Sequence, residues 1–152
     1  MFKIKNILLP TDFSKISLTA AEYAVELADE YKAKLHVLNV LEKTPPILAI
    51  RSLDLSREKI IETIDADAQE QLKDCIKKIK KIKDVEIVAT IQKGIDYEEI
   101  IKYSKDKKID VIVIATHGRT GILHTLLGSV AEKVIRYSKI PVLVTTPPSK
   151  SK

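Results

Sequence analysis

Residues 110–115 read DVIVIA, and this run decides the fold class of the 152-residue chain. After the aspartate every side chain is apolar, and most are β-branched, as strands prefer. Because no polar residue alternates with the apolar ones, we expect the strand to be buried on both faces. That pattern is typical of a parallel sheet with helices packed on each side. The segment that follows, THGRTGILHTLLGS (116–129), mixes glycines with polar residues, as a connection to a helix would.

Four more short apolar runs predict strands, and helical patterns separate them. The strands are expected over 4–9, 35–40, 85–91 and 140–144. The alternating order predicts an α/β fold, with one open five-stranded parallel sheet, right-handed crossovers and helices on both faces. Four helices are expected, from Ser14 or Ser17 to Tyr31, from Ser56 to Ile82, over about 97–105 and from Ser129 to Tyr137. Two of them are predicted to begin with a capping pair, Asp96 with Glu99 and Ser129 with Glu132.

The same pattern predicts how the chain is organised. No linker interrupts it, so we expect a single domain over 1–147 and a flexible tail over 148–152. Residues 42–55 contain Pro45 and Pro46 and are expected to form a loop. The helix that follows would be on the order of 40 Å long. We therefore expect it either to project beyond the body of the domain or to break.

Composition and charge exclude several classes of protein. Hydrophobic residues make up 45% of the chain and charged residues 31%, which is a globular balance. The net charge is +5, but lysine runs at 77–83 and 105–108 fall on predicted helix faces, which favours solvated surface over nucleic-acid binding. No apolar stretch approaches 18 residues, and residues 1–10 lack the features of a signal peptide. A cytoplasmic protein with no membrane partner is therefore expected.

Cys75 and His36 are predicted to be structural. Cys75 is the only cysteine, so a disulfide within the chain and a cysteine-based zinc site are excluded. It lies on the apolar stripe of the long predicted helix, which favours a buried and inert thiol. His36 alternates with apolar residues along a predicted strand, which also favours a structural role.

The segment after the 110–115 strand is the first candidate for binding chemistry. Three of the four glycines in the chain, Gly118, Gly121 and Gly128, fall within it. It ends at a predicted helix start, where free amides and the helix dipole favour an anion. A phosphate-binding loop is one interpretation. The other is a long connection whose glycines serve only turns.

The second candidate is PTDFS, residues 10–14, directly after the first predicted strand. An acid at the carboxyl end of a strand, such as Asp12, can accept hydrogen bonds from ribose hydroxyls or an adenine amino group, or hold a metal. The alternative is that Asp12 and Ser14 form an Asx turn or cap the following helix.

Together these segments resemble the universal stress protein family. The resemblance rests on IKNILLPTDFS (4–14), LHVLNV (35–40) and ATHGRTGILHTLLGSVAEKVIRYSKIPVLVTTP (115–147). The nucleotide motif of the family is G-x2-G-x9-G-S/T. Gly118, Gly128 and Ser129 match it in register, and Ala115 replaces its first glycine.

The resemblance implies a Rossmann-like sheet of the adenine nucleotide alpha hydrolase-like type, with strand order 3-2-1-4-5. It also implies an ATP site where the strand order reverses. Carried over to this chain, Asp12 would meet the ribose or adenine, and Val40 would contact the base through its backbone. The remaining implied residues are Pro10 and Thr11, which would shape the wall, and Gly118, Gly128, Ser129 and Val130, which would hold the phosphates.

Three further residues border the implied site. Ala115 would matter only if its position needs a positive φ or touches the ligand. His117 and Arg119 could contact phosphate oxygens or face solvent. Mg²⁺ could be shared between the phosphates and Asp12. No residue has an obvious role as a general base, so slow ATP hydrolysis is the most that we expect.

The resemblance also implies a homodimer formed through the last strand, Ile140 to Thr145. This run is apolar and uncharged, and at the edge of a sheet it would need a partner. The expected function is that of a small adenine-nucleotide-binding protein with a regulatory role in the stress response. The alternative is a dimeric interaction module that binds no nucleotide and whose glycine loop is structural.

Overall fold

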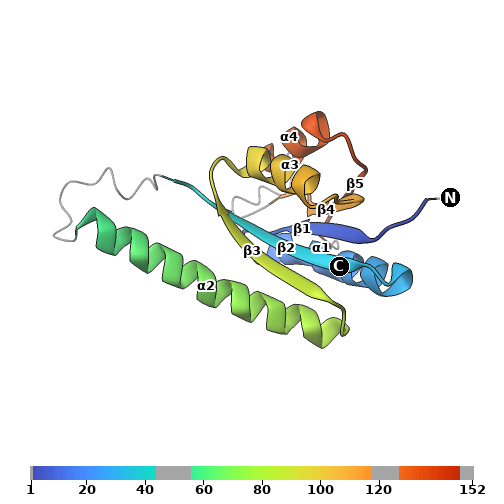
Figure 1. Ribbon diagram of the computed structural model, residues 1–152, viewed down its shortest axis with the longest axis horizontal. Coiled ribbons are helices and arrows are strands. Elements are labelled where there is room, and N and C mark those ends of the chain that lie inside the picture. The colour runs from blue at the N-terminus through green and yellow to red at the C-terminus, as the bar shows by residue number, and fades with distance from the viewer. Residues whose placement is uncertain (1, 44–55, 118–126, 148–152) are drawn as a thin grey trace, which may run out of the picture.

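The computed structural model of the chain describes residues 2–43, 56–117 and 127–147. It contains a single five-stranded parallel sheet of order β3-β2-β1-β4-β5 (Figure 1). This confirms the predicted fold class and strand order. The elements are β1 (Asn6–Pro10), α1 (Lys15–Tyr31), β2 (Lys34–Leu41), α2 (Arg57–Ile82), β3 (Ile87–Lys93), α3 (Asp96–Asp106), β4 (Val111–Ala115), α4 (Ser129–Tyr137) and β5 (Val142–Thr145).

Helices cover both faces of the sheet, as DVIVIA predicts. On β1, Ile7 and Leu9 belong to the core that packs under α1 and α2. Leu8, between them, belongs to the second core, under α3 and α4. All three side chains are fully buried, so the central strand alternates between two hydrophobic layers. None of the helices in the described ranges is both long and apolar enough to span a bilayer.

The helix starts agree with the sequence at two caps and differ at two others. Ser14 and Ser56 are the N-caps of α1 and α2, and each hydroxyl accepts a hydrogen bond from the amide three residues later. The predicted capping roles of Asp96 and Ser129 are wrong. Both lie inside the first turn, and the N-caps are Ile95 and Gly128, without side-chain cap bonds. An N-cap must be extended, and in both cases it is the preceding residue that is extended.

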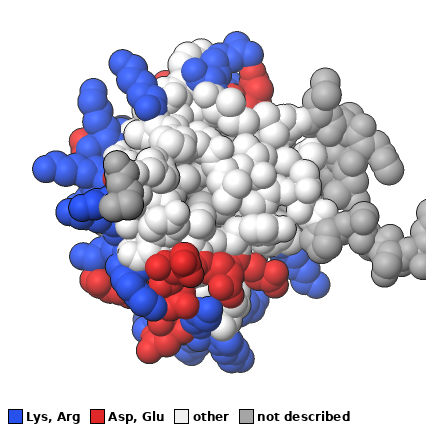
Figure 2. All heavy atoms as spheres, turned by 90° about the vertical axis from the view of Figure 1, so that its right-hand side faces the viewer, with Lys and Arg blue, Asp and Glu red and all other residues white. Residues whose placement is uncertain are grey.

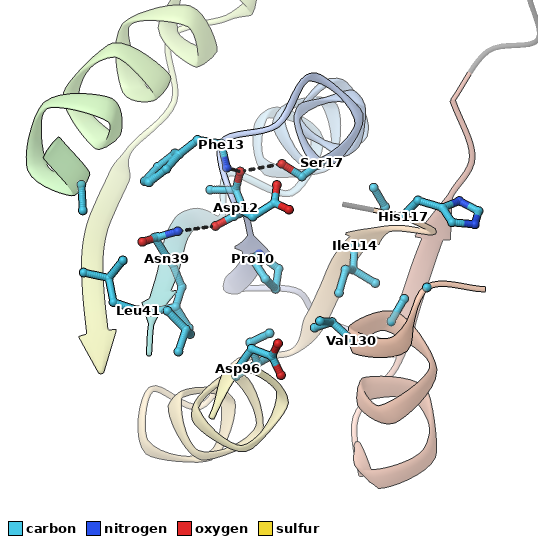
Figure 3. Close-up of a pocket in the computed structure, with 18 of the residues that line it drawn as sticks. Pro10, Asp12, Phe13, Ser17, Asn39, Leu41, Asp96, Ile114, His117 and Val130 are labelled. Carbon is cyan, nitrogen blue, oxygen red and sulfur yellow. Dashed lines mark hydrogen bonds between the residues drawn. The ribbon is translucent and has the colours of Figure 1, made fainter. Parts of the chain in front are cut away.

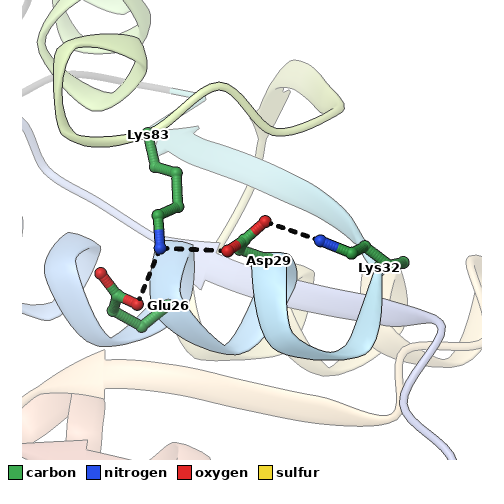
Figure 4. A network of polar contacts seen from close by, with 4 residues as sticks. All are labelled: Glu26, Asp29, Lys32 and Lys83. Carbon is green, nitrogen blue, oxygen red and sulfur yellow. Dashed lines mark hydrogen bonds and ion pairs between the residues drawn. The ribbon is translucent and has the colours of Figure 1, made fainter.

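The long helix does not break. α2 is continuous over 26 residues, and Figure 1 shows its N-terminal end reaching beyond the sheet. Its C-terminal end is tied to α1 by Lys83, whose Nζ lies 3.2 Å from Glu26 Oε2 and 3.0 Å from Asp29 Oδ2 (Figure 4). Lys32 Nζ also contacts Asp29, and together with Lys83 it lowers the pKa of that carboxyl. These charges are solvent-accessible, so the ion pairs contribute little to the stability of the fold.

His36 is structural, as predicted. Its ring is buried beneath α3, with Nδ1 2.8 Å from the Tyr103 hydroxyl and Nε2 3.2 Å from Asn6 Oδ1. Burial lowers the pKa of His36, and nearby Lys34 lowers it further. The neutral ring therefore joins β1, β2 and α3 through a small polar network.

Cys75 provides a test of the core under α2. Its side chain is 2% exposed, and burial raises the pKa of the thiol from about 9.0 to about 11. We expect Ellman's reagent to leave the native protein unmodified at pH 8 and to react stoichiometrically once urea unfolds it.

The raised pKa also means that the stability contributed by the neutral thiol is complete below pH 9 and is lost as the pH rises toward 11. Cys75→Ala should remove this alkaline loss, and rapid labelling of the native protein would contradict the packing of α2.

Candidate functional site

A pocket of about 690 Å³ opens at the carboxyl ends of β1, β2 and β4. This volume lies in the range of small-molecule sites. The strand order reverses here, because β1 lies between β2 and β4, and the chain continues from β1 to β2 in one direction along the sheet and from β4 to β5 in the other. In open α/β sheets this switch point is where ligands bind.

The structure brings the two predicted segments together around this pocket. The described residues among those predicted from the sequence all line it, and Gly118 and Arg119 lie outside the described residues. Those on the wall are Pro10, Thr11, Asp12, Val40, Ala115, His117, Gly128, Ser129 and Val130.

Asp12 both caps a turn and faces the pocket. Its Oδ1 accepts a hydrogen bond from the Ser14 amide at 3.0 Å, which is the predicted Asx turn. Figure 3 shows the carboxylate on the pocket side of the loop. The next residue, Phe13, has φ of 67°, a left-handed conformation that is rare for a bulky side chain. The two interpretations of Asp12 are therefore compatible, since the turn itself holds the acid at the pocket wall.

Gly128 is required by close packing. Its amide donates to the Thr116 carbonyl at 2.6 Å, and a Cβ on Gly128 would lie 2.7 Å from the same oxygen. Only a residue without a side chain lets the start of α4 approach the end of β4 so closely. The amide of Gly128 is thus used within the protein. Helix geometry leaves the next amides, those of Ser129 and Val130, without intrahelical acceptors and close to the pocket.

Ala115 fits its position without strain. Among the described residues, positive φ angles occur only at Phe13, Lys32, Lys108 and Gly94. Ala115 is the last residue of β4, it is 5% exposed, and its backbone is paired with Thr145 of β5. The position of the first motif glycine therefore needs no left-handed backbone here, and Ala115 belongs both to the core under α1 and to the residues that line the pocket.

Sequence reasoning missed one whole wall of the pocket. The helix α2 contributes Ile64, Asp67, Ala68 and Gln71, and α3 contributes Asp96. The helical periodicity of 56–82 places Ile64 and Ala68 on an apolar stripe, but it does not show which part of the sheet this stripe faces.

The pocket wall is acidic where it is charged. Asp12, Glu42, Asp67 and Asp96 line it, and the described part of the wall contains no lysine or arginine. Within residues 2–43, 56–117 and 127–147 no three His, Cys, Asp or Glu side chains are placed to hold a metal ion.

Two comparisons with known proteins, one with family models and one with curated sequences, point to the same protein family. Residues 3–146 match the family model of the Universal stress protein family. Universal stress protein MJ0531 of Methanocaldococcus jannaschii is 36% identical over 149 residues, which is 96% of this chain and 84% of that protein.

Solved structures share the fold over nearly the whole chain. The structure of hypothetical protein MJ0577 superposes with a TM-score of 0.80 at 28% identity, covering 97% of this chain and 99% of that one. A universal stress protein in complex with cAMP superposes with a TM-score of 0.72 at 22% identity, covering 95% of this chain and 98% of that one. The universal stress protein from Archaeoglobus fulgidus in complex with dAMP superposes with a TM-score of 0.65 at 21% identity, with the same coverage of both chains.

The packing of Gly128 predicts a stability effect that is separate from ligand binding. We expect Gly128→Ala to lower the free energy of unfolding by about 1–3 kcal/mol, because the new Cβ overlaps the Thr116 carbonyl. Urea denaturation measures this. Ser129→Ala, one residue away on the exposed side, is the matched control and should change stability by less than about 0.5 kcal/mol. Equal effects of the two variants would show that the close approach is not what requires glycine.

Proposed function

The chain belongs to the universal stress protein family, and on that premise we propose that it binds an adenine nucleotide and acts as a regulatory protein of the stress response. One observation carries the proposal. The pocket at the switch point is bordered on one side by Asp12 and on the other by the first turn of α4. The Asp12 carboxylate and the first turn of α4, whose amides have no intrahelical acceptors, thus border the same cavity.

Each part of a nucleotide has a matching group in the pocket. The amides of Ser129 and Val130, together with the Ser129 hydroxyl, would hold phosphate oxygens, helped by the dipole of α4. Asp12 would accept hydrogen bonds from ribose hydroxyls. The base would lie toward Val40 and the apolar wall of α2, where Ile64 lines the cavity. The volume of about 690 Å³ accommodates a molecule of this size.

The relatives support a nucleotide as the ligand class. Two proteins with the same fold are known in complex with cAMP and with dAMP. Both ligands contain adenine, a sugar and a single phosphate group. The adenine specificity proposed for this chain rests on this likeness together with the pocket geometry.

The charge of the pocket makes a prediction about Mg²⁺. Four carboxylates on the wall disfavour the free triphosphate, and Mg²⁺ bound to the phosphates would reduce this repulsion. We therefore expect Mg²⁺ to tighten the binding of ATP by more than it tightens that of AMP. The proposal concerns binding, and it assigns no residue to hydrolysis.

Calorimetric titration with ATP and with AMP, each with and without Mg²⁺, tests nucleotide binding. We expect Asp12→Ala to weaken binding on the order of tenfold, through the loss of a charged hydrogen-bond acceptor. Asp65→Ala removes an acid of α2 that pairs with Lys93 outside the main pocket, and it should leave the affinity unchanged. Absence of heat and of any thermal shift at millimolar nucleotide would contradict the proposal. The nucleotide-free interaction module would then be favoured, and absorbance at 260 nm of denatured protein tests for nucleotide that copurifies.

We further propose that two copies of the chain pair through β5. β5 is an edge strand of the sheet, as predicted. Leu143 at its middle is 39% exposed, and Ile140, Val142 and Val144 are half-buried. Figure 2 looks onto the side of the molecule where β5 lies in Figure 1, and it shows a broad face without charge, bordered by charged side chains above, below and to the left. An uncharged, apolar strand edge is suited to pairing with a second copy.

Analytical ultracentrifugation tests the dimer. We expect Leu143→Lys to convert it to a monomer, because the charge would be buried at the contact without a partner. Ala89→Lys places the same charge at an exposed position on β3, the opposite edge strand, and should leave the dimer intact. A wild-type protein that is monomeric at micromolar concentration would refute the dimer without affecting the nucleotide proposal.

A further inference from the structure

We propose that Asn39 is a positioning residue that holds the loop of Asp12 in its ligand-binding conformation. The inference rests on the proposed function, because it assigns a role within the nucleotide pocket. Asn39 lies near the end of β2, and its side chain is 5% exposed. Asn39 is not among the site residues predicted from the sequence.

Asn39 ties the loop to the neighbouring strand. Its Nδ2 donates to the Thr11 carbonyl at 2.8 Å, a buried hydrogen bond that Figure 3 shows at the pocket wall. The Thr11 amide in turn donates to the Leu38 carbonyl at 2.9 Å. Both backbone groups of Thr11 are thus held by β2, one residue before Asp12.

Thr11 then fixes the rest of the loop. Its hydroxyl accepts from the Phe13 amide at 3.0 Å and lies 2.9 Å from the Ser17 hydroxyl at the start of α1. Phe13 occupies the left-handed region, and such a conformation persists only where the surroundings over-determine it. Among the hydrogen bonds described here, the one from Asn39 is the only one that a side chain of β2 makes to the loop, so it joins the loop to the sheet.

Stability alone does not account for an asparagine at this position. Asn39 Oδ1 is buried and has no hydrogen-bond partner among the described residues. The reverse orientation of the amide would place Oδ1 against the Thr11 carbonyl, so the donor must face the loop. A buried acceptor without a partner opposes folding, whereas an apolar residue would suit a strand that also carries Leu35 and Val37 in its core. What an asparagine provides here, and an apolar residue would not, is the hydrogen bond to the loop of Asp12.

Hydrogen exchange in the ligand-free protein tests this positioning role. We expect Asn39→Leu to accelerate exchange of the Phe13 and Ser14 amides on the order of tenfold relative to the amide of Leu8 within β1. Val37→Ala is the matched control, since it weakens the same strand two residues away without touching Thr11. It should leave the ratio of loop to strand exchange unchanged. An unchanged ratio in Asn39→Leu would overturn the proposal.

A double-mutant cycle tests whether Asn39 acts through Asp12. With ATP and Mg²⁺ as the probe, Asn39→Leu should weaken binding on the order of tenfold, and it should have no further effect in the Asp12→Ala background. Val37→Ala should bind as the wild type does. If the two losses multiply, Asn39 does not act through Asp12, and the inference fails. If the wild-type protein does not bind ATP, the proposed function fails, while the exchange ratio still decides whether Asn39 holds the loop.

Discussion

The structure depends on the placement of β1 between β2 and β4. Backbone hydrogen bonds on both sides of β1 fix this order. The chain after β1 passes over one face through α1, whereas the chain after β4 passes over the other through α4. The helices α1 and α4 therefore lie on opposite faces of the sheet, and the pocket opens at the carboxyl ends of β1 and β4.

Two short contacts shape this space, and each involves main-chain atoms. At the end of β4, Gly128 rests against the Thr116 carbonyl, which sets the distance of the α4 first turn from the sheet. At the end of β1, Thr11 is held by β2, which sets the place of Asp12. The same contacts that close the fold at its carboxyl edge thus determine the shape of the candidate site. A substitution at Gly128 is expected to change stability as well as the shape of the pocket, so variants of Ser129 and Asp12 are the cleaner tests of the proposed ligand.

Local signals in the sequence predicted most of the elements. Apolar runs located all five strands to within two residues of their bounds. For the central strands β1 and β4 the reason is burial on both faces of the sheet, which leaves no polar alternation. Residue type predicted the cap Ser56, and it left Ser14 and Ser17 as alternatives for the first helix, of which the structure has Ser14. The capping pairs at Asp96 and Ser129 were wrong, because Ile95 and Gly128 are held in the extended conformation that an N-cap needs. The order of the strands came from family resemblance and not from the pattern itself.

The sequence by itself determined the layered α/β architecture and the two segments, around Asp12 and before Ser129, that border the pocket. Both are local properties, since they depend on periodicity and on residues adjacent in the chain. Only the tertiary structure decided that α2 supplies a wall, that Asp96 joins it, and that Asn39 reaches Thr11. These contacts join residues far apart in the sequence, and their partners are set by the packing of helices on a twisted sheet, which leaves no periodic signal in the chain.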